Sequence, residues 1–207
     1  MKGKFPFWMA AALLLCCAAS APAETKTQTL FDGATLKGWD ITRFGGEGEV
    51  QVVDKEIRID MGVGLSGIHW TNAFPTNQYE ISLEAKKIDG VDFFCGLTFP
   101  VGDSFLTLVV GGWGGAVVGL SNIDGHDASE NETTKYLFLD KNRWYKVRVR
   151  VTTEKVEAWI DDEKVASVPR QGKRFELRPG GVELGKPLGI TSWQTKAGIR
   201  NIRLKRL

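Results

Sequence analysis

The chain has 207 residues, of which 43% are hydrophobic and 25% charged, and its formal net charge is +2. This length and balance indicate one soluble globular domain that is large enough to bury a core. A charge so close to neutral favours neither nucleic acid nor an anionic membrane as a partner.

The first residues have the layout of a secretory signal peptide. Lys2 and Lys4 precede an apolar run from Phe7 to Ala19, and small residues up to Ala23 offer a cleavage site. The run is too short to span a bilayer, so no membrane span is expected. We therefore predict a signal peptide over 1–23, cleavage near Ala23, and a secreted or periplasmic domain over 24–207. Cleavage removes two lysines from the 27 basic residues, which then match the 25 acidic residues.

The cysteines divide in the same way. Cys16 and Cys17 lie in the predicted signal peptide and leave Cys95 alone, so no internal disulfide is expected. A lipid anchor at Cys16 or Cys17 is an alternative, although Leu15 stands where a small residue is expected. Cys95 lies in an apolar stretch and is predicted to be buried.

The first half of the domain predicts short strands. Residues 30–39 (LFDGATLKGW) predict a strand and a turn at Asp32-Gly33, followed by Leu36 and Trp39 as buried anchors. The next strands are expected at 50–53, 57–61, 65–70 and 79–85. Beyond them, 93–99 and 105–110 are apolar on both phases, which predicts strands covered on both faces.

The second half begins with a glycine-rich connection, 111–115, which leads to a strand at 117–120. A polar, acidic loop over 122–134 precedes a strand at 136–139. Alternating apolar and charged residues from Tyr145 onward predict a three-stranded antiparallel meander that ends at Val168 and has one buried face. Strands at 188–193 and 198–207 close the chain, with a bulge at Arg200-Asn201. The whole pattern predicts a single-domain, all-β antiparallel β-sandwich.

Three blocks of sequence carry a resemblance to a known family. They are LFDGATLKGW at 30–39, the meander from Trp144 to Asp161, and IRNIRL at 199–204. In this order and spacing the chain resembles the 3-keto-disaccharide hydrolase domain family over nearly all of the mature length. The resemblance implies a concanavalin A-like (jelly-roll or laminin G-like) sandwich, secretion in bacteria, and a carbohydrate or glycoside ligand.

The resemblance also implies a particular chemistry. A 3-keto group acidifies the hydrogen on C2 of the sugar, so that a base can remove it and expel the glycosidic oxygen. Such a route needs a general base and an electrophile at the keto oxygen, which is either a cation or a positioned Arg or His. His126 or His69 is a candidate for the base or a cation ligand, and Arg43 for the electrophile. His69 stands beside Trp70 in an expected strand, where packing is the simpler role.

The acidic loop offers the main candidates for chemistry. Asp124, His126, Asp127 and Glu130 are the candidate catalytic residues, because glycoside cleavage ordinarily uses a pair of carboxylates. Asp124, Asp127 and Glu132 are candidate ligands for a divalent cation such as calcium, which prefers several oxygen donors. A solvated loop without a ligand is the third alternative.

Aromatic residues point to sugar binding, since their rings stack on the apolar faces of pyranoses. Trp113 is flanked by glycines that allow close approach of a ligand. Trp193 and Gln194 end an expected strand, and with Arg43 they complete the candidate substrate-binding set. Trp159, on the charged phase of its strand, is a further candidate. The sequence thus favours a hydrolase or lyase acting on glycosides, with a non-catalytic carbohydrate-binding module and an envelope interaction domain as alternatives.

Overall fold

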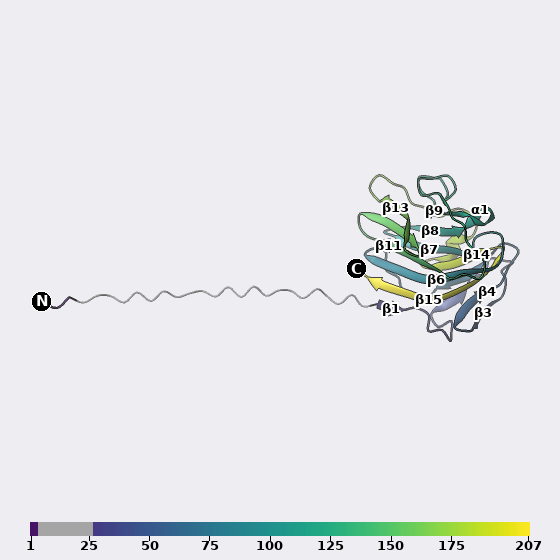
Figure 1. The fold of residues 1–207 in the computed structure, drawn as a ribbon, viewed down its shortest axis with the longest axis horizontal. Coiled ribbons are helices and arrows are strands. Elements are labelled where there is room, and N and C mark those ends of the chain that lie inside the picture. Colours follow the sequence, from purple (N-terminus) through teal and green to yellow (C-terminus); the bar gives the residue numbers. More distant parts are fainter. Residues whose placement is uncertain (4–26) are drawn as a thin grey trace.

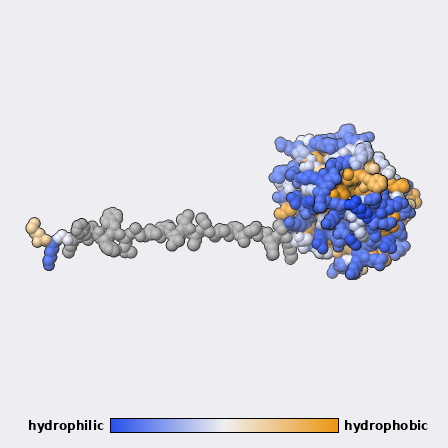
Figure 2. Space-filling model, viewed as in Figure 1, coloured by the Kyte–Doolittle hydropathy of each residue, from blue (hydrophilic) through white to orange (hydrophobic). Residues whose placement is uncertain are grey.

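The computed structural model describes residues 1–3 and 27–207. Most of the predicted signal peptide, together with Cys16 and Cys17, lies outside the described residues. Within the described ranges, none of the helices has the length and apolar character needed to cross a bilayer. Figure 1 shows residues 27–207 folded into two layers of strands, with β1 beside β15. In the same view, the surface is mainly hydrophilic and has one larger hydrophobic area (Figure 2).

An eight-stranded antiparallel sheet forms one layer of residues 27–207, and it contains the predicted meander. Its order is β13-β12-β11-β6-β15-β4-β3, and β1 also pairs with β15. The strands are β1 (Thr27–Thr29), β3 (Val50–Val53), β4 (Glu56–Ile59), β6 (Tyr79–Gly90), β11 (Tyr145–Val151), β12 (Lys155–Ile160), β13 (Glu163–Pro169) and β15 (Thr195–Arg206).

A seven-stranded antiparallel sheet forms the other layer, in the order β10-β9-β8-β7-β14-β5-β2. Its strands are β2 (Trp39–Ile41), β5 (Leu65–Trp70), β7 (Cys95–Val101), β8 (Ser104–Gly111), β9 (Val117–Ser121), β10 (Lys135–Tyr136) and β14 (Gly189–Trp193). The α1 turn (Gly112–Gly115) joins β8 to β9, and the 3-10 turn η1 (Val182–Gly185) lies in the connection from β13 to β14. The predicted all-β, concanavalin A-like sandwich is therefore confirmed.

The core lies between the sheets and follows the period-two pattern of the strands. In β6, Tyr79, Ile81 and Ala85 are fully buried, whereas the glutamates between them face outward. Leu97, Leu108, Leu120 and Ile190 supply the facing side from the seven-stranded sheet. Burial raises the pKa of the Cys95 thiol to about 12, in line with its predicted place in the core.

The outer face of the seven-stranded sheet is also covered, as the apolar phases of β7 and β8 predict. The acidic loop packs on it through Ala128, which contacts Val109 and Val117. The connection from β13 to β14, residues 170–188, crosses the same face and is called the strap below. Side chains on the outward phase of these strands, such as Thr98, Thr107 and Thr191, are thus buried. A pocket can form only where the covering segments leave a gap.

Some boundaries differ from the sequence-based predictions. The strand expected at 136–139 is reduced to Lys135–Tyr136, because the chain turns so that Phe138 is exposed while Leu139 enters the core. The first strand precedes Leu30, which is itself a buried anchor. The predicted bulge is confirmed by a register shift in β15 between Arg200 and Arg203.

Candidate functional site

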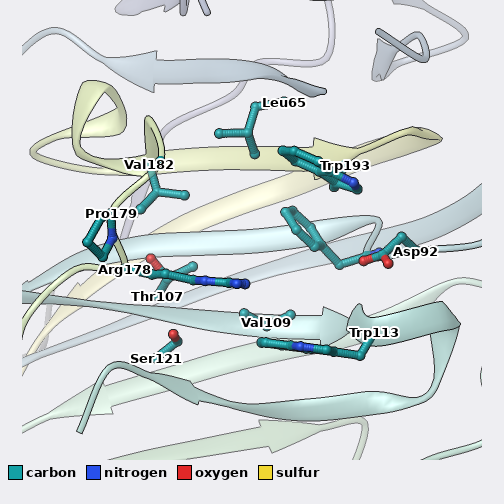
Figure 3. A pocket seen from close by; sticks show the side chains of 12 residues that line it. Leu65, Asp92, Thr107, Val109, Trp113, Ser121, Arg178, Pro179, Val182 and Trp193 are labelled. Atoms are coloured by element: carbon teal, nitrogen blue, oxygen red, sulfur yellow. The ribbon is translucent and has the colours of Figure 1, made fainter. Parts of the chain in front are cut away.

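A pocket of about 370 Å³ opens on the outer face of the seven-stranded sheet (Figure 3). Strands β5, β8, β9 and β14, the α1 turn and the strap all contribute to its wall. It is called the aromatic pocket below, and it is lined by Leu65, Asp92, Phe93, Thr107, Val109, Trp113, Ser121, Arg178, Pro179, Gly180, Val182 and Trp193.

The alternation of side chains along β8 determines which residues form the floor of the pocket. Leu106, Leu108 and Val110 of β8 point into the core, so Thr107 and Val109 point to the outer face. Thr107 is directly opposite Ser121 of β9, which adds a second hydroxyl. The floor is therefore a narrow patch with one apolar and two hydroxyl side chains.

Two tryptophans form opposite walls of the pocket, as Figure 3 shows. Trp193 ends β14 beside Leu65, and its backbone N–H donates to the carbonyl of Phe93 at 3.0 Å. Trp113 rises from the α1 turn. Each tryptophan side chain is 39% exposed, which leaves ring surface free for a ligand. Planar aromatic surface beside hydroxyl groups suits a ring that has apolar faces and polar edges.

The position of Trp113 depends on a run of left-handed backbone. Gly111, Trp113 and Gly114 have φ values of 84°, 50° and 85°. Glycine adopts this region at little cost, whereas tryptophan does so only under constraint from its surroundings. The constraint includes Asp92, whose Oδ2 accepts a hydrogen bond from the Gly114 N–H at 3.1 Å. Asp92 also accepts from the Phe93 N–H at Oδ1, at 2.8 Å.

Arg178 approaches the pocket from the strap, opposite Asp92 (Figure 3). Its guanidinium carbon lies 5.3 Å from the centroid of the Trp113 ring, within the range of a cation–π contact. Its Nε is 3.8 Å from Asp127 Oδ2 in the acidic loop. Among the described residues that line the pocket, Asp92 is the single carboxylate and Arg178 the single cation.

Of the candidates from the sequence, Trp113 and Trp193 line this pocket and the others do not. Gln194 is turned away, with Nε2 donating to the Val63 carbonyl at 2.9 Å. Arg43 is 76% exposed and pairs with Glu47 at 3.1 Å. His69 is half-buried, with Nδ1 at 2.9 Å from the Thr42 hydroxyl, and Trp159 lies on the other sheet.

The acidic loop lies beside the pocket, and three of its carboxylates, Asp124, Asp127 and Glu132, already have partners. Lys173 of the strap bridges Asp124 at 3.0 Å and Glu132 at 2.7 Å. A backbone hydrogen bond from Arg174, together with Lys173, lowers the pKa of Asp124, and the hydrogen bond from Lys173 lowers the pKa of Glu132. Asp127 accepts from the Ser129 hydroxyl at 2.7 Å.

The remaining loop candidates, His126 and Glu130, are exposed. No group of three or more acidic, His or Cys side chains within the described ranges is arranged to hold a metal. Of the three candidate cation ligands, Asp124 and Glu132 pair with Lys173, and Asp127 lies 3.8 Å from Arg178. A cation site at these residues stays a prediction.

Asp92 and Arg178 were missed at the level of sequence. Asp92 stands at the start of an apolar strand, and Arg178 lies in a segment without periodicity. Only the packing of the strap across the sheet brings the two residues to one pocket. A lone carboxylate just before a strand that is apolar on both phases was the one available signal.

The fold is a two-layered antiparallel β-sandwich with a pocket on the outer face of one sheet. Several solved structures are similar to it. A Bacillus subtilis protein of unknown function with a galectin-like fold has a TM-score of 0.61 at 13% identity, over 87% of this chain and 94% of the other. The Bacillus licheniformis β-glucanase has 0.57 at 8% identity, over 90% and 100%. A Bacillus subtilis carbohydrate-binding module has 0.51 at 13%, over 81% and 95%. These likenesses establish the fold.

The family itself is shown by sequence. The chain belongs to the 3-keto-alpha-glucoside-1,2-lyase-like domain family, whose model matches residues 26–205. The match confirms the resemblance seen in the three blocks of sequence. Among curated proteins, none matches the chain in sequence. The sequence match thus shows the family, and the solved structures, among them a β-glucanase and a carbohydrate-binding module, show the fold.

Proposed function

We propose that this protein binds a glycoside in the aromatic pocket and cleaves it by elimination, as a lyase or hydrolase acting on 3-keto-glycosides. The observation that carries the proposal is the position of one carboxylate, Asp92, and one guanidinium, Arg178, on opposite sides of a pocket that has two tryptophans in its walls. The description of the family as 3-keto-alpha-glucoside-1,2-lyase-like supports the same reaction class.

The number of carboxylates favours elimination over ordinary glycoside hydrolysis. Direct hydrolysis uses two carboxylates, about 5 to 9.5 Å apart, as acid and as base or nucleophile. The described lining of the pocket provides one, Asp92. Elimination from a 3-keto sugar needs one base for the C2 hydrogen and one positive group at the keto oxygen. Asp92 and Arg178 meet this smaller demand.

In the proposed elimination, the C2–H bond and the C1–O glycosidic bond of the sugar are broken. Asp92 takes the proton from C2, and Arg178 stabilises the negative charge that develops on the C3 oxygen. The electron pair then forms a C1=C2 double bond while the C1–O glycosidic bond breaks, and the departing oxygen takes a proton from water. Asp92 returns its proton to solvent. Addition of water across the new double bond would complete a net hydrolysis.

The geometry of Asp92 is compatible with the role of base. Each of its oxygens accepts one backbone N–H, which fixes the carboxylate relative to the Trp113 turn. A carboxylate oxygen has capacity for more than one hydrogen bond, so a proton can still be taken. The tryptophan walls would orient the sugar ring by stacking.

A second candidate function is a non-catalytic carbohydrate-binding module. It is favoured by the absence of a second carboxylate from the described pocket lining and by the two hydrogen bonds that already engage Asp92. Both functions place the sugar in the same pocket. We also propose that the protein acts outside the cytoplasm, because residues 1–23 have the layout of a signal peptide.

The test is turnover of a chromogenic 3-keto-glucoside by the wild-type protein, Asp92→Asn and Asp124→Asn. We expect Asp92→Asn to lower kcat at least about hundredfold, because the general base is lost. Asp124→Asn makes the same chemical change in the acidic loop, outside the pocket, and should leave kcat within about twofold. An unfolding midpoint for each variant separates loss of chemistry from loss of fold.

Two further readouts identify the mechanism. Elimination should produce a conjugated enone that absorbs in the ultraviolet, and deuterium from D2O should enter C2 of recovered substrate or hydrated product. If Asp124→Asn rather than Asp92→Asn abolishes turnover, the acidic loop is the catalytic site. If the wild type binds the sugar without any turnover, the binding module is the correct function.

A further inference from the structure

The outer face of the eight-stranded sheet carries a strong excess of positive charge. Apart from Lys196, which pairs with Asp60 at 2.5 Å, ten basic side chains share its outward positions with four glutamates. Asp54, in the turn before β4, lies 3.7 Å from one of the ten, Arg58. The whole chain has a formal charge of only +2. This surface is called the basic face below. Its basic residues are Arg58, Lys86, Lys146, Arg148, Arg150, Lys155, Lys164, Arg200, Arg203 and Lys205, and its glutamates are Glu56, Glu80, Glu84 and Glu157.

Strand pairing places these residues in rows across the sheet. One row runs from Lys164 through Trp159 and Arg148 to Ser82 and Arg203. Adjacent strands are about 4.8 Å apart, so the row sets its cations at regular intervals along a line perpendicular to the strands. A repeating, extended polymer of opposite charge would match such a row.

The glutamates do not cancel the excess of positive charge, because three of the four glutamates each pair with two cations. Glu80 pairs with Arg148 at 3.1 Å and with Arg150 at 2.8 Å. Glu157 pairs with Lys155 at 3.1 Å and with Lys164 at 2.7 Å. Glu56 is shared in the same way by Arg58 and Lys86.

The depths of the two kinds of group also differ. The glutamate side chains are 4–21% exposed, whereas those of their cation partners range from 18% at Lys86 to 48% at Lys164. Most of the cations therefore extend further into solvent than the carboxylates with which they pair. Burial by itself raises the pKa of Glu157, but its hydrogen bonds and ion pairs with Lys164 and Lys155 outweigh this effect and lower it. The carboxylate thus stays charged beneath its partners.

Three cations of the basic face have no ion pair within the described residues. They are Lys146, Arg203 and Lys205, and each is at least partly exposed. Lys146 and Arg200 both lie opposite Glu84, but only Arg200 pairs with it, at 2.7 Å. These three side chains are free to meet an anionic ligand without the loss of an existing interaction.

We propose that the basic face binds an acidic polysaccharide, one that bears uronate or sulfate groups along its length. Guanidinium groups bind carboxylates and sulfates through paired hydrogen bonds, and lysines add point charges. An extended chain can follow the rows of cations. The proposal is independent of the catalytic step and of the aromatic pocket, which opens on the opposite sheet.

The same observations disfavour other polyanions. Single-stranded nucleic acid on a sheet is usually held by exposed aromatic platforms. Trp159 is 9% exposed and lies under Arg148, whose guanidinium is 3.7 Å from the ring centroid. Trp144 is partly exposed, and its ring is covered by Lys86 at 4.5 Å and Arg200 at 4.0 Å. A membrane surface would be met by inserted apolar side chains. None of the exposed large hydrophobic side chains of residues 27–207 belongs to the strands of the basic face.

The test measures binding of the purified protein to polygalacturonate, and to neutral dextran as a comparison. We expect polygalacturonate to bind with a Kd that rises steeply with salt, as for any polyelectrolyte contact, and dextran not to bind. Lys146→Gln/Arg203→Gln/Lys205→Gln should raise the Kd at least about tenfold. Lys37→Gln/Lys186→Gln, which removes exposed lysines away from this face, should change it less than about twofold.

Other outcomes would overturn the proposal. Equal binding by the triple variant and the wild type would exclude the basic face, and no binding at about 50 mM salt would exclude the interaction. Retention by single-stranded DNA or anionic vesicles but not by polygalacturonate would assign the face to another partner. Trp113→Ala should still bind polygalacturonate, so failure of this proposal is distinguishable from failure of the pocket.

Discussion

The guanidinium of Arg178 lies over the indole ring of Trp113, 5.3 Å from the ring centroid, and so joins the strap to the α1 turn. The same side chain reaches toward Asp127 of the acidic loop at 3.8 Å. Three segments that are separate in sequence thus meet at one wall of the aromatic pocket.

Trp113→Ala should weaken sugar binding about tenfold to hundredfold, because it removes one of the two stacking surfaces. The thermal midpoint should change little, since the ring is 39% exposed and contributes little to the core. Isothermal titration with a glycoside ligand measures the effect. Trp144→Ala serves as the matched control, because Trp144 stacks with Lys86 and Arg200 on the other sheet. Comparable losses from both variants would contradict a pocket-specific role.

Arg178→Gln should lower kcat about hundredfold if the guanidinium stabilises charge on the keto oxygen, which is typical for loss of one such donor. Arg178→Lys keeps the charge but not the planar group, and it should recover part of the rate. Steady-state kinetics separate stabilisation of charge by Arg178 from a purely structural role of this residue. A structural role predicts that Lys rescues neither kcat nor KM, and that the midpoint of unfolding falls with both variants.

Lys173→Met should loosen the acidic loop, because Asp124 and Glu132 lose their shared partner. Hydrogen exchange should quicken in 122–134 and remain unchanged in β6. The folded-state pKa values of both carboxyls are lowered, so their contribution to stability is present at neutral pH. It is lost as the pH falls through those lowered values. Acidification of the wild type should therefore lower the protection factors of 122–134, as Lys173→Met does, and equal protection factors at neutral and acidic pH would contradict this expectation.

Cys95 should resist thiol reagents in the native protein at pH 8 and react only when the chain unfolds. Burial raises the pKa of its thiol from 9.0 to about 12, so the native state retains the proton where the unfolded state loses it. The stabilising effect is complete below about pH 9 and is lost as the pH rises toward 12, at up to about 1.4 kcal/mol per pH unit. Cys95→Ala should lessen this alkaline slope, as denaturant titration at pH 8 and pH 10.5 can show.

Local patterns in the sequence were enough to predict most of the fold. The alternation in β6 and β11 reflects a sheet with one buried face, and the structure pairs these strands directly. The apolar phases of β7 and β8 predicted cover on both faces, which the strap and the acidic loop provide. Strand ends were harder to predict where an apolar residue such as Leu139 packs in the core although it lies outside a strand.

The candidate site was predicted only in part. The glycines around Trp113 marked a place of close approach, and Trp113 lines the pocket together with Trp193. The acidic loop was predicted from its density of carboxylates, but the density of carboxylates does not show which of them form ion pairs. Lys173 lies more than thirty-five residues further along the chain from either of the carboxylates that it bridges. Spacing along the chain could not have indicated that pairing.

The sequence by itself determined the alternation of strands, the burial of Cys95, the bulge near Arg200 and the family, because each depends on residues close together or on blocks in fixed order. The tertiary structure decided which carboxylate and which cation share the pocket and how the charges are divided between the two sheets. Those relationships join residues from distant strands and loops. They arise when the strap crosses the sheet and when strand register aligns side chains in rows, and neither event leaves a local pattern in the sequence.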